Sequence, residues 1–104
     1  MKIPKRVKIL GQIYTVGYQS EMQDDMGECD YQNNTITLLS GMPEEKMMQT
    51  FLHEIVHAID FTMNLNLKEN QVDNMSVALY QILKENNIVV KPFQERKKTC
   101  STKK

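Results

Sequence analysis

Two histidines and a glutamate have the residue types and the spacing that metal chemistry requires. His53 and His57 are the only histidines in the chain, and Glu54 directly follows the first of them. In a helix, residues four apart lie one above the other, so both imidazoles can reach a single ion from the same face. Glu54 is placed beside this pair, where it can take a proton from a metal-bound water. The His-Glu-x-x-His pattern therefore predicts a zinc site with Glu54 as the catalytic general base.

The third protein ligand cannot be a histidine. A catalytic zinc usually has three protein ligands and an open position, so the missing ligand must be a carboxylate or a thiolate. Asp60 would lie on the same helix as the histidines, where its short side chain is poorly placed, and a capping or solvated role is favoured for it. Glu69 and Asp73 lie one helical turn apart, further along the chain, and both remain candidates at this point.

The strands and turns that must support this site come first in the chain. Segments 7–10 and 12–18 are rich in residues that favour strands and flank Gly11, which predicts a hairpin. A second extended pair is expected at 27–31 and 35–39, with Asn33 and Asn34 as the turn.

Two helices are expected to follow. Pro43 suits a first helical position, and the first helix is expected from Pro43 to about Met63. The second is expected from about Lys68 to Asn86. The first helix should bury one broad face and leave the histidines on the other; that apolar face comprises Met48, Phe51, Leu52, Ile55 and Ile59. The second should carry an apolar stripe of Val72, Met75, Leu79, Ile82 and Leu83, and a separate polar stripe of Glu69, Asp73, Ser76 and Tyr80.

These residues resemble the gluzincin branch of the zincin metallopeptidases, in which a glutamate on the following helix completes the zinc site. Residues 69–73, Glu-Asn-Gln-Val-Asp, are similar to the motif of that helix, and the likeness extends to minigluzincins and to small phage-type and ImmA/IrrE-type proteins over roughly residues 5–90. The resemblance implies Glu69 as the third ligand. It also implies that Asp73 accepts the free N–H of a ligating imidazole, a role that suits its spacing. The fold to expect is a small α+β domain, in which an antiparallel or mixed sheet packs on the active-site helix and a second helix follows.

Length and charge set the outer limits of the prediction. The 104 residues suffice for one domain, expected at 1–93, with a basic, mobile tail at 94–104. The formal net charge of zero is a cancellation, because residues 9–95 hold four basic and all thirteen acidic residues.

No apolar run is long enough for a membrane helix, and a cytoplasmic location is expected. Cys29 and Cys100 are expected to be reduced, and a tail thiolate from Cys100 occupying the open zinc position is a further, less favoured idea.

The function expected is hydrolysis of peptide bonds in a peptide or protein substrate, with one zinc ion held by His53, His57 and Glu69 and with Glu54 as general base. The alternative is a non-catalytic, zinc-stabilised binding or regulatory module. Nucleic-acid binding through the basic ends is not favoured, because no aromatic or groove-reading pattern accompanies them. In zincins the substrate pairs with an edge strand, and the resemblance implies that 27–31 or 35–39 supplies it. No residue is selected as the oxyanion stabiliser among Tyr14, Tyr18 and Tyr31.

Overall fold

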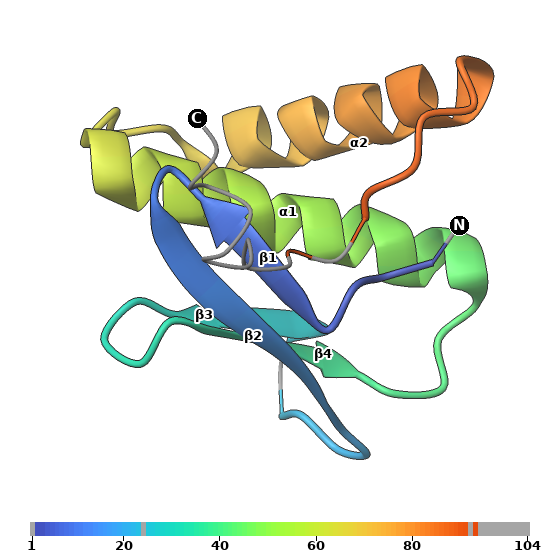
Figure 1. The fold of residues 1–104 in the computed structure, drawn as a ribbon, viewed down its shortest axis with the longest axis horizontal. Helices are drawn as coiled ribbons and strands as arrows, with labels where there is room; N and C mark the ends of the chain where they lie inside the picture. Colours follow the sequence, from blue (N-terminus) through green and yellow to red (C-terminus); the bar gives the residue numbers. More distant parts are fainter. Residues whose placement is uncertain (1, 24, 92, 94–104) are drawn as a thin grey trace, which may run out of the picture.

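The computed structural model describes residues 2–23, 25–91 and 93, and it has an α+β fold in which four strands precede two helices. The strands are β1 (Arg6–Ile9), β2 (Gln12–Gln19), β3 (Gly27–Asp30) and β4 (Thr35–Leu39), and the helices are α1 (Glu44–Met63) and α2 (Glu69–Glu85). Figure 1 shows three layers, with the sheet below, α1 across one face of it and α2 on the far side of α1. The expected tail at 94–104, with Cys100, lies outside the described residues.

The sheet consists of two hairpins joined edge to edge. β1 pairs antiparallel with β2, and the connecting residues Leu10 and Gly11 both have positive φ, as a tight two-residue hairpin turn requires. β3 pairs antiparallel with β4 around Asn34, which also has a positive φ. The two hairpins meet through a parallel pairing of β2 with β4, so the strand order is β1-β2-β4-β3 and the sheet is mixed. β3 is therefore an edge strand.

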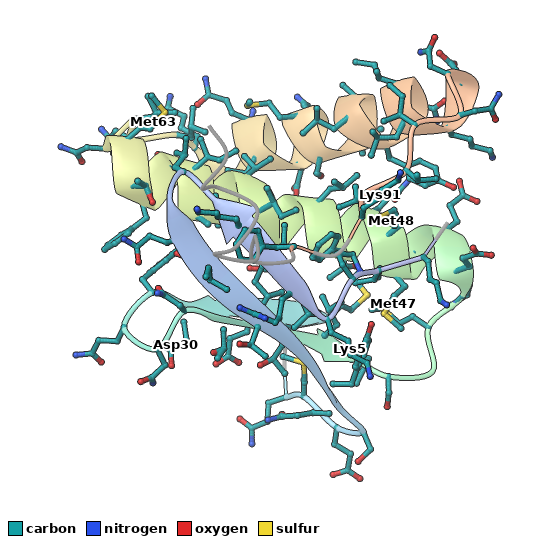
Figure 2. The ribbon with its side chains drawn as sticks, viewed as in Figure 1. Lys5, Asp30, Met47, Met48, Met63 and Lys91 are labelled. Atoms are coloured by element: carbon teal, nitrogen blue, oxygen red, sulfur yellow. The ribbon has the colours of Figure 1, made fainter. Side chains whose placement is uncertain are left out.

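The core lies between the sheet and α1. Tyr14, Ile36 and Leu38 point from the sheet toward α1 and are almost completely buried, and Met48 and Phe51 of α1 meet them. Met48, labelled in Figure 2, belongs to this layer. α1 is also covered by α2 on its other side, so its buried residues include Val56 and Ala58 as well as the predicted Met48, Phe51 and Leu52. Ile55 and Ile59 are only half-buried.

The predicted apolar stripe of α2 is partly wrong. Val72 is buried, but Met75 and Ile82 are 43% and 50% exposed. Ser76 and Tyr80, which were expected on a polar stripe, are buried instead. The reason is that α2 packs on α1 and on no other described helix or strand, so the narrow contact follows Val72, Ser76 and Tyr80 and leaves its flank open.

No helix in the part of the chain that the structure describes has the length and apolarity to cross a membrane.

Candidate metal centre

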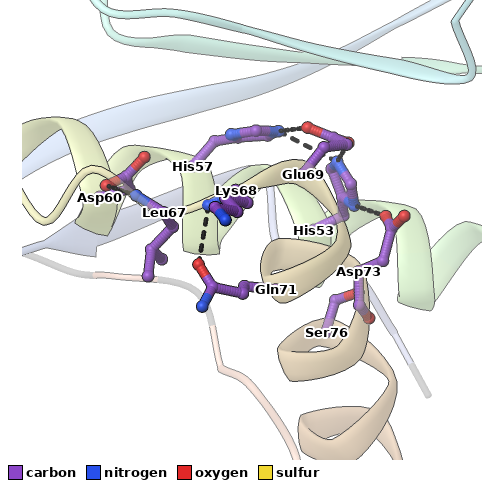
Figure 3. A network of polar contacts seen from close by, with 9 residues as sticks. All are labelled: His53, His57, Asp60, Leu67, Lys68, Glu69, Gln71, Asp73 and Ser76. Carbon is purple, nitrogen blue, oxygen red and sulfur yellow. Dashed lines mark hydrogen bonds and ion pairs between the residues drawn. The ribbon is translucent and has the colours of Figure 1, made fainter.

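Three side chains converge between α1 and α2. The Nε2 atoms of His53 and His57 are 3.0 Å apart, Glu69 Oε2 lies 3.0 Å from His53 Nε2, and Glu69 Oε1 lies 3.5 Å from His57 Nε2. One ligand atom from each residue falls within 4.8 Å of the others (Figure 3). Two imidazoles and a carboxylate aimed at one point are compatible with a metal ion, as the sequence predicted for His53, His57 and Glu69.

Asp73 lies behind His53. Its Oδ1 is 3.0 Å from His53 Nδ1, on the opposite side of the ring from the nitrogen that faces Glu69. Such a contact favours the tautomer in which Nδ1 carries the proton and donates it to Asp73, leaving the Nε2 lone pair directed at the converging atoms. The structure thus places Asp73 where the sequence predicted it, and Figure 3 shows the four residues in one connected network.

A short, well-anchored connection brings Glu69 to the histidines. α1 ends at Met63, and the residue that caps it, Asn64, has a left-handed backbone conformation. The Asp60 carboxylate accepts a hydrogen bond from the backbone N–H of Leu67. Gln71 accepts one from the backbone N–H of Lys68 at the start of α2. These contacts fix where α2 begins, so Glu69 enters in its first turn, opposite His53. Asp60 therefore caps the connection, and the capping role expected for it is confirmed.

Glu54 is buried beside the histidines. It is 5% exposed, and burial, followed by the negative charges of Glu69, Asp25 and Glu28, raises its pKa to about 7. The start of β3 covers it closely, because a Cβ added to Gly27 would lie 3.1 Å from Glu54 Oε2. Glu54 nevertheless borders the cleft described next.

A cleft of about 450 Å³ opens in front of this centre. His53, Glu54, Glu69 and Asp73 line it together with Gly27, which begins an expected rim segment, and Ser76, which belongs to the expected polar stripe of the second helix. The other lining residues have no role predicted from the sequence: Asp25, Met26, Lys46, Gln49, Thr50 and Val77. Lys46, Gln49 and Thr50 lie seven, four and three residues before His53, so the helical periodicity of α1 was a signal that could have identified them. Residues 25–27 precede or begin the edge strand, and only the tertiary packing brings them to the cleft.

The sheet topology distinguishes the two segments expected at the rim, and the three tyrosines considered as oxyanion stabilisers lie in different surroundings. Of the two segments proposed for the rim, β3 is the one at the edge of the sheet, while β4 is paired on both sides. Tyr14 is buried in the core and Tyr18 is half exposed near the end of β2. Tyr31 follows β3 and stacks on Phe61 of α1, with ring centroids 4.2 Å apart.

Comparisons of the chain with protein-family models, with curated proteins and with solved structures found no match.

Proposed function

We propose that this protein is a zinc-dependent metallopeptidase of the gluzincin type. The observation that carries the proposal is the convergence of His53, His57 and Glu69 on one point next to the buried Glu54. Local spacing accounts for the histidines alone. Glu69 comes from a different helix, so its arrival at the same point is independent support.

The donor set favours zinc. Zinc in proteins prefers imidazole, thiolate and carboxylate ligands at about 2.0–2.3 Å in a tetrahedral arrangement, which for nitrogen and oxygen donors corresponds to donor atoms about 3.3 Å apart. His53 Nε2 lies 3.0 Å from His57 Nε2 and 3.0 Å from Glu69 Oε2, which is close to this separation, and Glu69 presents its other oxygen, Oε1, 3.5 Å from His57 Nε2. When bound, zinc supplies a Lewis acid that polarises a substrate carbonyl and lowers the pKa of water.

In this proposal, Asp73 orients a metal ligand and Glu54 transfers protons. Asp73 keeps the His53 ring oriented by accepting a hydrogen bond from its Nδ1–H. Glu54, against which the start of β3 packs closely, would accept the proton of the attacking water at its carboxylate and return it to the leaving amine.

A peptide is the favoured substrate because of β3. This strand forms the open edge of the sheet, and residues at its start border the cleft. An extended peptide can pair with an exposed strand edge through main-chain hydrogen bonds that do not depend on its side chains. Such pairing would lay the peptide along β3 and across the cleft.

The experiment compares zinc-loaded wild type with Glu54→Gln, His57→Ala and Glu69→Ala. Metal content is measured by mass spectrometry, and cleavage is measured on a peptide library of mixed sequence. Glu54→Gln should retain one zinc ion per chain while losing turnover by a factor on the order of 10² or more. The other two variants should lose zinc affinity and turnover together. Unchanged zinc affinity in Glu69→Ala would contradict the ligand assignment, and full turnover in Glu54→Gln would contradict the mechanism.

One observation favours a second candidate, a non-catalytic module in which zinc holds two helices together. α2 packs on α1 alone among the described helices and strands, so an ion shared by the two helices would hold α2 in place. In that case the wild type would bind zinc and gain stability but cleave no peptide in the library.

A further inference from the structure

The metal cleft extends from the candidate ligands toward the N-terminal end of α1. Lys46 and Gln49 border it, and they lie seven and four residues before His53, on the same side of α1. α2 runs antiparallel to α1 (Figure 1). Because Asp73 contacts His53, Val77, one turn further along α2, lies level with the turn of α1 that precedes the histidine. The cleft therefore continues for about two helical turns beyond His53.

Lys46 is the only lysine or arginine among the residues that border this cleft. Acidic residues three or four positions away on the helix could pair with it, but those positions hold Met42, Pro43, Gln49 and Thr50. No carboxylate in the part of the chain that the structure describes forms an ion pair with Lys46. Its ammonium group is therefore available to an anionic group of a ligand in the cleft.

The distance from Lys46 to the metal centre corresponds to a short piece of peptide. Lys46 and His53 are separated by about 10.5 Å along the axis of α1. An extended peptide advances about 3.3 Å per residue. A peptide whose cleaved bond lies at the metal centre would therefore reach Lys46 with the second or third residue beyond that bond.

The direction of β3 determines which end of a bound peptide reaches Lys46. Gly27, at the start of β3, lies against Thr50, whereas Tyr31, just after the strand, stacks on Phe61. β3 therefore runs in the same direction as α1, away from the end that carries Lys46. A peptide that pairs antiparallel with β3, which is the slightly more stable arrangement, runs the opposite way. Its C-terminal part would then point toward Lys46.

We propose that Lys46 binds the C-terminal carboxylate of the substrate, so that the enzyme releases two or three residues from the C-terminal end of a peptide. The reaction is hydrolysis: water gives its hydroxyl group to the carbonyl carbon of the cleaved bond and a proton to the amine of the released piece. Met26 and Val77, which border the cleft and are 43% and 45% exposed, would flank the side chains of that piece. The release of peptides rests on the proposed function, whereas binding of a carboxylate by Lys46 does not.

The first measurement uses an N-acetylated hexapeptide that wild type cleaves, made with a free or an amidated C-terminus. Zinc-loaded wild type should release a dipeptide or tripeptide from the free acid, with kcat/KM about five- to tenfold higher than for the amide. A third peptide is amidated but carries an aspartate among its last three residues. Equal kcat/KM for this peptide and the free acid would overturn the assignment to the chain end, because Lys46 would then bind an acidic side chain.

The second measurement needs no turnover. Acetyl-trialanine with a free carboxylate and the corresponding amide are titrated into zinc-loaded Glu54→Gln by isothermal titration calorimetry. The acid should bind about five- to tenfold more tightly than the amide. A carboxylate can also bind zinc directly, so the titration is repeated with Lys46→Met added, which removes the ammonium group and leaves the zinc ligands in place.

Three variants test the role of the charge. Lys46→Met keeps the approximate length of the side chain but removes its charge, so the preference for the acid should fall toward one in both measurements. Lys46→Arg should retain most of the preference. Lys84→Met, at an exposed position of α2 outside the cleft, is the matched control and should leave the preference unchanged. Circular dichroism verifies that each variant is folded.

The outcomes separate this inference from the proposed function. If no peptide is cleaved but the acid binds more tightly than the amide and Lys46→Met removes the difference, the proposed function fails and the carboxylate site stands. If peptides are cleaved at internal bonds with equal kcat/KM for acid and amide, and the two bind equally, the carboxylate site is overturned and the proposed function stands. Release of residues from the N-terminal end, or a preference for the acid that survives in Lys46→Met, would also overturn it.

Discussion

Gly27 is a residue at which the edge strand β3 passes close to α1. A Cβ at this position would lie 2.6 Å from Thr50 Cγ2 and 3.1 Å from Glu54 Oε2, so only glycine lets β3 pass over α1 at this distance. The Glu54 carboxylate thus lies directly against a stretch of strand that carries no side chain.

Gly27→Ala is therefore expected to destabilise the fold by about 1–3 kcal/mol and to lower turnover, because β3 or Thr50 must move. Thr50→Ser removes the methyl group that the new Cβ meets while keeping the hydroxyl that donates to the carbonyl of Lys46. Urea denaturation of the two single variants and of the double variant measures the coupling between the positions. Additive free energies of unfolding would show that the two side chains do not compete for this space.

Cys29, which also lies in β3, has a thiol with a strongly raised pKa. Burial, followed by the charges of Glu54 and Asp30, raises the pKa of its thiol from 9.0 to about 12. A raised pKa means that the folded state disfavours the thiolate, so this contribution to stability is complete below pH 9 and is lost as the pH rises toward 12. The difference in unfolding free energy between wild type and Cys29→Ala should therefore shrink between about pH 8 and pH 10.5, as urea denaturation at each pH can measure.

In a Cys100→Ser background, alkylation of Cys29 by iodoacetamide should be at least about 100-fold slower in the folded than in the urea-unfolded protein. Equal alkylation rates would show that the thiol is not buried in solution.

How much of the site could be predicted depends on whether a residue acts through local or tertiary spacing. His53, Glu54 and His57 could be identified because one helical turn fixes their relation. Glu69 was predicted only through a resemblance, since nothing in the helical period says where the second helix begins. Residues 27–31 were expected as a candidate rim, but the close approach of Gly27 to Glu54 and the stacking of Phe61 on Tyr31 were not predicted, because both contacts arise where a strand edge crosses a helix.

The elements themselves were largely predictable, with two exceptions that have different causes. Both hairpins and both helices begin and end within about two residues of the expected positions, because Gly11, Asn34, Pro43 and Asn64 mark the turns and helix ends. The parallel pairing of β2 with β4 was not predicted, since strand patterns carry no information about which hairpin lies next to which. The face of α2 was predicted incorrectly because Tyr80, with both an apolar ring and a hydroxyl, was assigned to the polar side.

A pair of substitutions in α2 tests the corrected face. Val72 is 1% exposed and Ile82 is 50% exposed, although both were expected on one stripe. Val72→Ala should cost about 1–3 kcal/mol of unfolding free energy through the cavity it leaves, whereas Ile82→Ala should change it by less than about 1 kcal/mol. Chemical denaturation of the two variants measures the difference. The reverse order of costs would restore the stripe that the sequence suggested.

At the scale of the whole molecule, the candidate metal centre joins the outermost layer to the rest. α2 is attached by its packing on α1, by a connection of five residues and by the contacts of Glu69 and Asp73 with the histidines. A metal ion at this centre would bind the folded state and not the unfolded state, so it should stabilise the whole fold by mass action.

Zinc at about 100 times its dissociation constant should add about 2.7 kcal/mol to the unfolding free energy. For a chain of this size that corresponds to an increase in Tm of roughly 10 °C or more, which a chelator should reverse. Differential scanning calorimetry with and without zinc measures the effect, and Glu69→Ala should show a smaller increase than wild type. An identical Tm in zinc and in chelator would contradict a metal centre at this position.

The parallel pairing of β2 with β4 also has a consequence for the order of folding. Within each hairpin the paired residues closest to the turn are at most five positions apart, but Thr15 pairs with Thr35 across twenty. Closing that longer loop costs more chain entropy before any contact repays it, so joining the hairpins should limit the folding rate. Val16→Ala, at the junction, should then slow refolding in stopped-flow measurements, whereas Val72→Ala in α2 should mainly accelerate unfolding. The sheet that supports α1 would thus be assembled before α2 brings Glu69 to the histidines.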